Sequence, residues 1–378
     1  MLSALAAVFV RSEAQTVPEN TLSQNSRYQC RDSGSYTLNP VIVGAFGTKQ
    51  KTWYQKTLPF LFKYNSLPDI PTTDFERIYA RPLAVGESKR SQQIRTDARQ
   101  KLLELQQSAE QNWQTWLKSN PNADSEDQKT AETKIHFQGL AQEKLSQFDW
   151  SKNGVDVGTV GFQGFGCNTC WAFASLDAMQ ISRQIAALRR PDLTIDQNLT
   201  PKVQQLISCF VPKKADFCNF NWHGEAFSFM VDKGLPLGGT GEYDAANNQK
   251  WTCRPDKYVK ALTWDFVSRD PKYVSETEDI KRALILYGPI VSMIKYNDCF
   301  FRYGGGVFDE EDNRDGTHLV LIIGWDDEKG AWRIKNSFGE QWGEKGFGWV
   351  KYGSNNIGEG SAWIMADPKE ELITTGKN

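Results

Sequence analysis

The chain has 378 residues, of which 39% are hydrophobic and 24% charged, and its formal net charge is −2. This composition excludes a disordered chain, and the near-neutral charge argues against a nucleic-acid-binding or anionic-membrane protein. The length favours two or three domains. We expect no integral membrane segment, because the apolar stretch at residues 1–10 is too short to span a bilayer.

The first 87 residues carry weak signals. Residues 1–15 resemble the hydrophobic part of a secretory signal, with small residues around Ser12 and Ala14, but the usual basic start is missing. They are a candidate truncated signal peptide, and the alternative is an ordinary buried segment. Residues 16–87 are rich in proline, asparagine and aromatics, which predicts an irregular packed extension with a strand over residues 40–46.

The clearest helix of the chain is predicted over residues 88–119. One apolar stripe recurs at steps of three and four residues: Ile94, Ala98, Leu102, Leu105, Ala109, Trp113 and Trp116. We expect this stripe to pack on the rest of the protein, and a coiled-coil dimer is the alternative. A polar loop over residues 120–129 and a weaker helix over residues 131–148 follow, and His136 is interpreted as a surface histidine.

A glycine-rich turn then leads into an apolar helical pattern over residues 170–188, and Cys170 begins that helix. A thiol at a helix N-terminus feels the positive end of the helix dipole, which favours the nucleophilic thiolate. Two donors for an oxyanion are predicted nearby: the backbone N–H of Cys170 and the side-chain amide of Gln163. This stretch therefore predicts a reactive cysteine.

A second set of chemical groups lies far downstream. His318 precedes a continuous apolar run to Trp325, which predicts a buried strand with the histidine at its mouth. A turn and a second strand over residues 331–335 follow, and Asn336 ends that strand. A cysteine paired with a histidine, which an amide oxygen orients, is the Cys-His-Asn form of nucleophilic acyl transfer.

The motifs around Gln163 and Cys170, His318, and Asn336 to Trp342 occur in the order found in papain and the cathepsins. From about residue 148 to residue 363 the chain resembles this family of cysteine proteases. The resemblance implies an α+β fold over residues 149–378, with a helical subdomain and an antiparallel β-barrel subdomain. Expected helices are 170–188, 200–209 and 225–233, and expected strands are 288–296, 304–308, 318–325, 331–335 and 346–352.

The resemblance also implies roles for individual residues. Asn336 would orient His318, and Trp342 would lie over the hydrogen bond between them. Phe338 stands where the family usually has a second tryptophan and can still shield this bond. Gln163 lies seven residues before Cys170, one more than is usual, and the adjacent glycines can absorb the extra residue.

The substrate cleft departs further from the family. Phe220 and Asn221 stand where two glycines in the family usually pair with the substrate, and we expect Gly224 to restore that contact after an insertion. By position, Ile294 and Gly316 would line the pocket for the second residue before the cleaved bond, which suggests an apolar preference.

Seven cysteines bear on the cellular compartment. The family pattern implies the disulfides Cys167–Cys218 and Cys209–Cys253. Cys30 and Cys299 remain, and the sequence leaves open whether they pair or stay free. Two disulfides imply an oxidising compartment, so we expect a secreted, periplasmic or lysosome-like location.

The sequence thus predicts a monomeric cysteine endopeptidase that acts on polypeptides without a metal or cofactor. We expect it to be made as a zymogen, with residues 16–148 as a largely helical prosegment that inhibits the enzyme. Alternatives are a permanent accessory domain over these residues, a catalytically silent binding protein, or a Cys-His-Asn amidase or acyl transferase.

Overall fold

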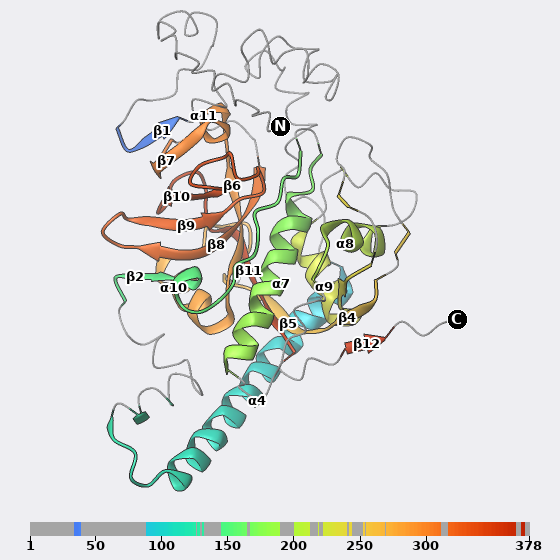
Figure 1. Ribbon diagram of the computed structural model, residues 1–378, viewed down its shortest axis with the longest axis vertical. Coiled ribbons are helices and arrows are strands. Elements are labelled where there is room, and N and C mark those ends of the chain that lie inside the picture. The colour runs from blue at the N-terminus through green and yellow to red at the C-terminus, as the bar shows by residue number, and fades with distance from the viewer. Residues whose placement is uncertain are drawn as a thin grey trace, which may run out of the picture.

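The computed structural model describes residues 34–38, 88–125, 127–128, 131, 145–164, 167–189, 200–211, 218, 222–239, 242–243, 252–253, 255–268, 270–310, 317–367 and 372–374. The helix α7 (Cys170–Arg189) runs through the middle of the molecule (Figure 1). A large sheet lies along one side of α7, and the helices α8 (Val203–Phe210) and α9 (His223–Asp232) lie along the other. This arrangement is the two-part α+β fold that the sequence predicts.

Helix α7 is the core of the helical part because apolar residues surround it on most sides. Trp171, Ala172, Ala178 and Met179 have no exposed surface. A helix that is apolar nearly all round must be covered by other elements, and α7 contacts α8, α9 and the large sheet. A small sheet completes this part, with β3 (Leu235–Leu237), β4 (Lys257–Val259) and β12 (Leu372–Thr374) in the order β12-β4-β3.

The large sheet has the strand order β1-β7-β10-β9-β8-β6-β11-β5, and β2 also pairs with β8. The bounds are β1 Tyr36–Leu38, β2 Gln147–Asp149, β5 Ala261–Phe266, β6 Ile290–Lys295, β7 Tyr303–Phe308, β8 Thr317–Asp326, β9 Ala331–Lys335, β10 Phe347–Lys351 and β11 Glu359–Ala366. Its pairs are antiparallel except β7 with β10, which run parallel. The sequence predicts an antiparallel barrel, and the observed sheet departs from this at one parallel pair.

The predicted helices and strands of the catalytic part match the observed ones to within a few residues. Elements that the sequence did not predict are β1 to β5, β11, β12, α10 (Thr277–Tyr287), the short helix α11 (Asp298–Phe301) and the 3-10 turn η2 (Trp150–Lys152). Strand β2 replaces the end of the helix predicted over residues 131–148, and residues 132–144 lie outside the described part of the chain. Helix α10 carries apolar or aromatic residues at successive steps of three, one and three: Ile280, Ala283, Leu284 and Tyr287. This helical pattern was available in the sequence.

Helix α4 (Lys89–Ser119) confirms the long helix predicted over residues 88–119. Ser88 caps it, since its side chain accepts a hydrogen bond from the backbone N–H of Ser91. Ile94 and Ala98 are buried, whereas the far end of the helix extends away from the sheet and the other helices (Figure 1). Trp113 and Trp116 stack on each other there, with ring centroids 5.3 Å apart.

Polar contacts fix the first half of α4 on α9 and β5. Glu225 of α9 accepts hydrogen bonds from the Ser88 backbone at 2.9 Å and the Ser91 hydroxyl at 3.0 Å. Arg90 pairs with Asp232 at 2.5 Å, and Arg95 pairs with Asp265 at 2.6 Å. The helix therefore docks on the catalytic part through an apolar stripe with ion pairs at its edge.

Strand β1 joins the N-terminal region to the other end of the large sheet. It pairs antiparallel with β7, and Tyr36 lies opposite Gly306. The Tyr36 hydroxyl donates to the buried Glu310 carboxylate at 2.6 Å, and its ring packs on Phe308. The strand predicted over residues 40–46 lies outside the described residues.

Both predicted disulfides are present, Cys167–Cys218 and Cys209–Cys253. Cys299 is also disulfide-bonded, so the alternative of a free Cys299 is wrong, and Cys30 lies outside the described residues. No helix in the described part of the chain is long and apolar enough to cross a membrane.

Candidate active site

The predicted nucleophile, base and oxyanion donor line one pocket between α7 and the large sheet. Cys170 enters from the start of α7, His318 from the start of β8, and Gln163 from the turn before α7. The pocket wall consists of Gln163, Gly164, Asn168, Cys170, Tyr296, Phe301, Thr317, His318 and Phe338. Residues far apart in the sequence thus meet where the helical part faces the sheet.

Cys170 is a buried thiol that forms no disulfide. Burial raises the pKa of this thiol to about 11. Three backbone N–H groups, those of Leu319, Trp171 and Cys170 itself, lower this pKa by a smaller amount. The structure reverses the direction expected from the helix dipole alone, because removal of the thiolate from water outweighs the backbone dipoles. Burial therefore favours the neutral thiol of Cys170.

The orientation of His318 is fixed by Asn336. His318 Nε2 lies 2.7 Å from Asn336 Oδ1, and the same oxygen accepts from the backbone N–H of Ser337 at 2.8 Å. A flipped amide would direct its NH2 group at that N–H donor, so the contact fixes Oδ1 toward His318. The imidazole must then carry its proton on Nε2, which leaves Nδ1 as the basic nitrogen.

His318 is also neutral in this arrangement. Burial lowers the pKa of its imidazole to about 4, and the hydrogen bond that it donates to Asn336 Oδ1 raises this pKa by less. A neutral thiol next to a neutral imidazole can exchange one proton, which creates two opposite charges that attract each other. Such a pair is suited to general base catalysis, in which the thiol loses its proton as it attacks.

Gln163 is held by contacts with both sides of the pocket. Its Oε1 accepts from the Ser337 hydroxyl at 2.6 Å, and its Nε2 donates to the Cys167 carbonyl at 3.2 Å. Its backbone N–H donates to the Ser337 carbonyl at 2.9 Å. An amide NH2 has two protons, so Gln163 retains one to donate to an oxyanion.

Phe338, rather than Trp342, covers the imidazole of His318. The two rings stack with centroids 4.5 Å apart and planes 24° apart. Trp342 is buried and donates its indole N–H to the Phe300 carbonyl at 2.7 Å. Its ring contacts Phe300 and Phe338, which both contact His318, so Trp342 forms a second layer behind the histidine.

The residues predicted for substrate binding do not gather in the pocket. Ile294 is fully buried on β6 directly opposite His318, and Gly224 lies in the first turn of α9 against Trp222 and Trp264. Their positions give no support to a direct contact with substrate. Gly316, Phe220 and Asn221 lie outside the described residues.

Several pocket residues were missed by the sequence reading. Tyr296 precedes the short helix α11 and Phe301 ends it, and both supply aromatic walls, while Asn168 lines the turn side. Ser337 directly follows Asn336, so its position next to a predicted catalytic residue was an available signal. Among the described residues, no group of three or more His, Cys, Asp or Glu side chains gathers as a metal site requires.

Comparisons with known proteins agree with this geometry. The chain is 28% identical over 222 residues to the P34 probable thiol protease of Glycine max, which covers 56% of this chain and 54% of that protein. It is 31% identical over 221 residues to cathepsin 7 of Rattus norvegicus, which covers 55% and 61%. The chain thus spans about half to two thirds of the length of these relatives.

A solved structure of proCathepsin B S9 from Trypanosoma congolense has the same fold. It superposes with a TM-score of 0.50 and 19% sequence identity, over 61% of this chain and 80% of that chain. The sequence model of the papain family cysteine proteases matches residues 145–365, more than half of the chain. With its cysteine, histidine and glutamine around one pocket and its asparagine bonded to the histidine, the chain belongs to the papain family of cysteine proteases.

Proposed function

We propose that this chain is a cysteine endopeptidase that cleaves polypeptides through a thioester on Cys170. One observation carries the proposal: Gln163, Cys170 and His318 line one pocket, and Asn336 holds His318 with Nδ1 as its basic nitrogen. These four side chains supply the nucleophile, the base, its orienting group and an oxyanion donor. The cysteine that begins α7 is the group on which the activity depends.

The reaction then uses groups of this chain alone. The Cys170 thiol transfers its proton to His318 Nδ1 as the sulfur forms a bond with the substrate carbonyl carbon. The backbone N–H of Cys170 and the free proton of Gln163 Nε2 stabilise the oxyanion. The C–N bond breaks as His318 returns the proton to the amine, and water then hydrolyses the thioester with His318 as base.

The walls of the pocket favour apolar substrate side chains. Tyr296, Phe301 and Phe338 surround the catalytic groups with aromatic rings, and Phe162 is half exposed beside Phe338. Apolar side chains gain most from burial against such surfaces. The two disulfides support a site of action in an oxidising compartment, as in secreted or lysosome-like proteins.

We further propose that the chain is made as a zymogen. Two ion pairs, Arg90 with Asp232 and Arg95 with Asp265, help to fix α4 to the catalytic part. The pKa of Asp232 is lowered from its ordinary value of 3.8 by its hydrogen bond with Arg90, so this contact stabilises docking at pH 4.5 and at pH 7 and is lost only at lower pH. No residue of β1 or α4 lines the described pocket, so inhibition requires another part of the N-terminal region.

Active-site labelling tests the activity. Once the N-terminal region has been cleaved off, a peptide epoxide that alkylates thiols should modify Cys170 stoichiometrically and stop the cleavage of a peptide library. A cleaved chain that resists alkylation would support a silent binding protein. Release of amine from side-chain amides without peptide cleavage would instead support an amidase or acyl transferase. The Cys170→Ser variant is the matched control, since its hydroxyl resists alkylation.

Incubation of the full-length chain tests the zymogen. Samples kept at pH 4.5 and pH 7 are analysed together by gel and by peptide assay. We expect activity to appear with cleavage between about residues 120 and 146, before β2 begins. Full activity of the uncut chain would make residues 16–148 an accessory region rather than an inhibitor.

A further inference from the structure

The turn between Gln163 and Cys170 has to hold an oxyanion donor and the nucleophile at a fixed separation. Neither residue belongs to a strand of the sheet, and Gly164 has a φ of 78°, in the left-handed region that favours glycine. The turn is also one residue longer than is usual in the family. A backbone hydrogen bond from Gln163 to the Ser337 carbonyl fixes one end of the turn, and side-chain contacts help to fix its separation from α7.

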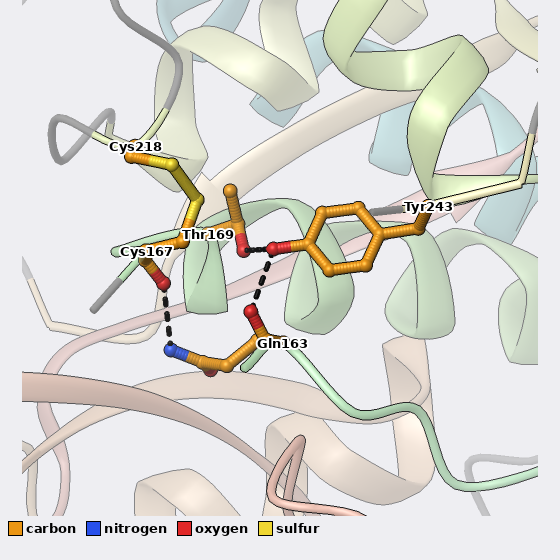
Figure 2. Close-up of a disulfide and its surroundings, with 5 residues drawn as sticks. All are labelled: Gln163, Cys167, Thr169, Cys218 and Tyr243. Atoms are coloured by element: carbon orange, nitrogen blue, oxygen red, sulfur yellow. Dashed lines mark hydrogen bonds between the residues drawn. A yellow bond between two sulfur atoms is a disulfide. The ribbon is translucent and has the colours of Figure 1, made fainter. Parts of the chain in front are cut away.

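Tyr243 bridges the two ends of this turn (Figure 2). Its hydroxyl lies 2.7 Å from the Gln163 carbonyl oxygen and 2.6 Å from Thr169 Oγ1. The carbonyl can only accept, and a phenol has one proton, so Tyr243 donates to Gln163. The Thr169 hydroxyl must then donate to the Tyr243 oxygen, which determines the direction of both hydrogen bonds.

Each partner of Tyr243 adjoins a catalytic group. Gln163 supplies the side-chain oxyanion donor, and Thr169 directly precedes Cys170 and is fully buried. The Thr169 carbonyl accepts from the backbone of Ala172 at 2.8 Å, so Thr169 belongs to the start of α7. The bridge thus links the oxyanion donor to the end of the helix that carries the nucleophile.

Tyr243 is itself held in place from the helical part of the molecule. Its ring packs edge-on against Phe173 of α7, with centroids 5.1 Å apart. The adjacent residue Glu242 pairs with Lys202 at 3.0 Å, next to the start of α8. The phenol comes from 80 residues beyond Gln163 and is half-buried, so it reaches the turn as a separate support.

We propose that Tyr243 is a positioning residue for the oxyanion site, which acts by fixing the peptide plane of Gln163 relative to the start of α7. This inference rests on the proposed peptidase function. Removal of the Tyr243 hydroxyl frees the Gln163 carbonyl to rotate. This rotation moves the Gln163 Nε2 donor away from the oxyanion. The effect falls on steps that form an oxyanion, and it leaves the nucleophilicity of the thiol unchanged.

Tyr243→Phe tests this role because the ring remains and only the hydroxyl is lost. We expect kcat for an amide substrate to fall roughly tenfold, as the loss of about one neutral hydrogen bond predicts, with KM within about twofold. Alkylation of Cys170 by iodoacetamide forms an S–C bond with loss of iodide and creates no oxyanion. Its rate should stay within about twofold of wild type, whereas a loosened α7 would change both rates.

A double variant identifies the route of the effect. In a Gln163→Ala background, Tyr243→Phe should change kcat by less than about twofold, since the donor that it positions is gone. A full additional tenfold loss would overturn the proposal. Thr169→Val should also lower kcat, whereas Thr169→Ser, which keeps the hydroxyl, should retain the kcat of the wild type.

Tyr258→Phe is the matched control, because that hydroxyl contacts the sulfurs of Cys209 and Cys253. It should leave kcat unchanged. Unchanged kcat in Tyr243→Phe, with an active wild type, would reject the positioning role and leave the peptidase function intact. A wild type that stays inactive and alkylation-resistant after its N-terminal region has been cleaved off would instead reject the proposed function itself.

Discussion

The two sides of the pocket are built in different ways. On the sheet side, His318 lies in β8 and Asn336 directly follows β9. Backbone hydrogen bonds to neighbouring strands fix the register of both strands. On the turn side, one backbone hydrogen bond joins Gln163 to Ser337, and the separation of Gln163 from α7 depends on side-chain contacts with Ser337 and Tyr243 and on the Cys167–Cys218 disulfide. The base is therefore positioned by a sheet, and the oxyanion site by a few individual side chains.

This difference predicts how each side responds to mutation. A strand residue can change its side chain and keep its ladder of backbone hydrogen bonds, because those bonds do not depend on side-chain identity. A turn that is fixed by three or four side-chain contacts loses a large share of its support with each one. Substitutions on the turn side other than loss of the disulfide should therefore lower kcat while they change the free energy of unfolding little.

The largest effect should come from the nucleophile itself. Cys170→Ala should abolish peptide cleavage, because no other group can form the thioester, and the fold should remain since alanine fits the start of a helix. Peptide turnover and circular dichroism of the purified variant measure the two effects. More than trace turnover would reject Cys170 as nucleophile.

Removal of a disulfide compares the turn side with a distant site. Cys167 and Cys218 are 51 residues apart, and Cys209 and Cys253 are 44 apart. Replacement of either pair by alanine should lower the free energy of unfolding by about 4 kcal/mol in the loop-entropy model. Only loss of Cys167–Cys218 should also lower kcat, because the backbone N–H of Asn168 donates to the Cys218 carbonyl.

Denaturant unfolding and steady-state kinetics on both double variants separate stability from catalysis. Equal falls in kcat for the two would mean that the turn needs no disulfide of its own. Non-reducing peptide mapping of the wild type provides the check that both bonds form.

Gln163→Ala should lower kcat roughly 100- to 1,000-fold with little change in KM, since one oxyanion donor typically contributes about 2.7–4 kcal/mol to the transition state. The contact of Gln163 with Ser337 provides a comparison. Ser337→Ala keeps the donor but loses the hydroxyl that holds its Oε1, so a smaller loss is expected. A near-normal rate in Gln163→Ala would show that another group donates to the oxyanion.

A smaller effect concerns acid stability, because each part of the molecule buries one neutral imidazole. Burial lowers the pKa of both His318 and His223 to about 4. Between pH 6.5 and 4 the unfolded chain binds protons that the folded chain does not, so the free energy of unfolding falls as pH falls. Each histidine contributes about 3 kcal/mol to this loss.

His223→Phe should remove about half of this dependence, since the ring of His223 packs among Trp222, Phe227 and Phe266. Denaturant unfolding from pH 7 to 4, in a Cys170→Ala background that prevents self-digestion, measures the slope. An unchanged slope would assign the acid sensitivity to other groups.

Much of the sheet side could be predicted from sequence because its signals are local. The apolar run after His318 marks β8, and Asn336 directly follows the alternating residues of β9. The raised pKa of Cys170 could not be predicted in this way, because burial of the thiol depends on β8 and α11 as well as on its own helix. The sequence indicates a helix N-terminus, whose dipole lowers the pKa of the thiol. It does not indicate the burial, which raises this pKa by a larger amount.

The turn side shows the other limit. Tyr243 occurs in a polar stretch with no periodicity, and only the fold brings its hydroxyl to Gln163 and Thr169. The docking of α4 was predicted as an apolar stripe in need of a surface, but the choice of α9 and β5 depends on ion pairs with Asp232 and Asp265. Contacts between distant segments left no local pattern from which to infer them.

The pairing of β1 with β7 has a consequence for the synthesis of the chain. Tyr36 is made 274 residues before Glu310, the buried carboxylate that its hydroxyl meets. At ribosomal rates of about 5–20 residues per second, that interval lasts roughly 14 to 55 s. During this time β1 has no partner strand, because β7 has not yet been synthesised. The pairing of β1 with β7 therefore forms only after most of the chain has been made.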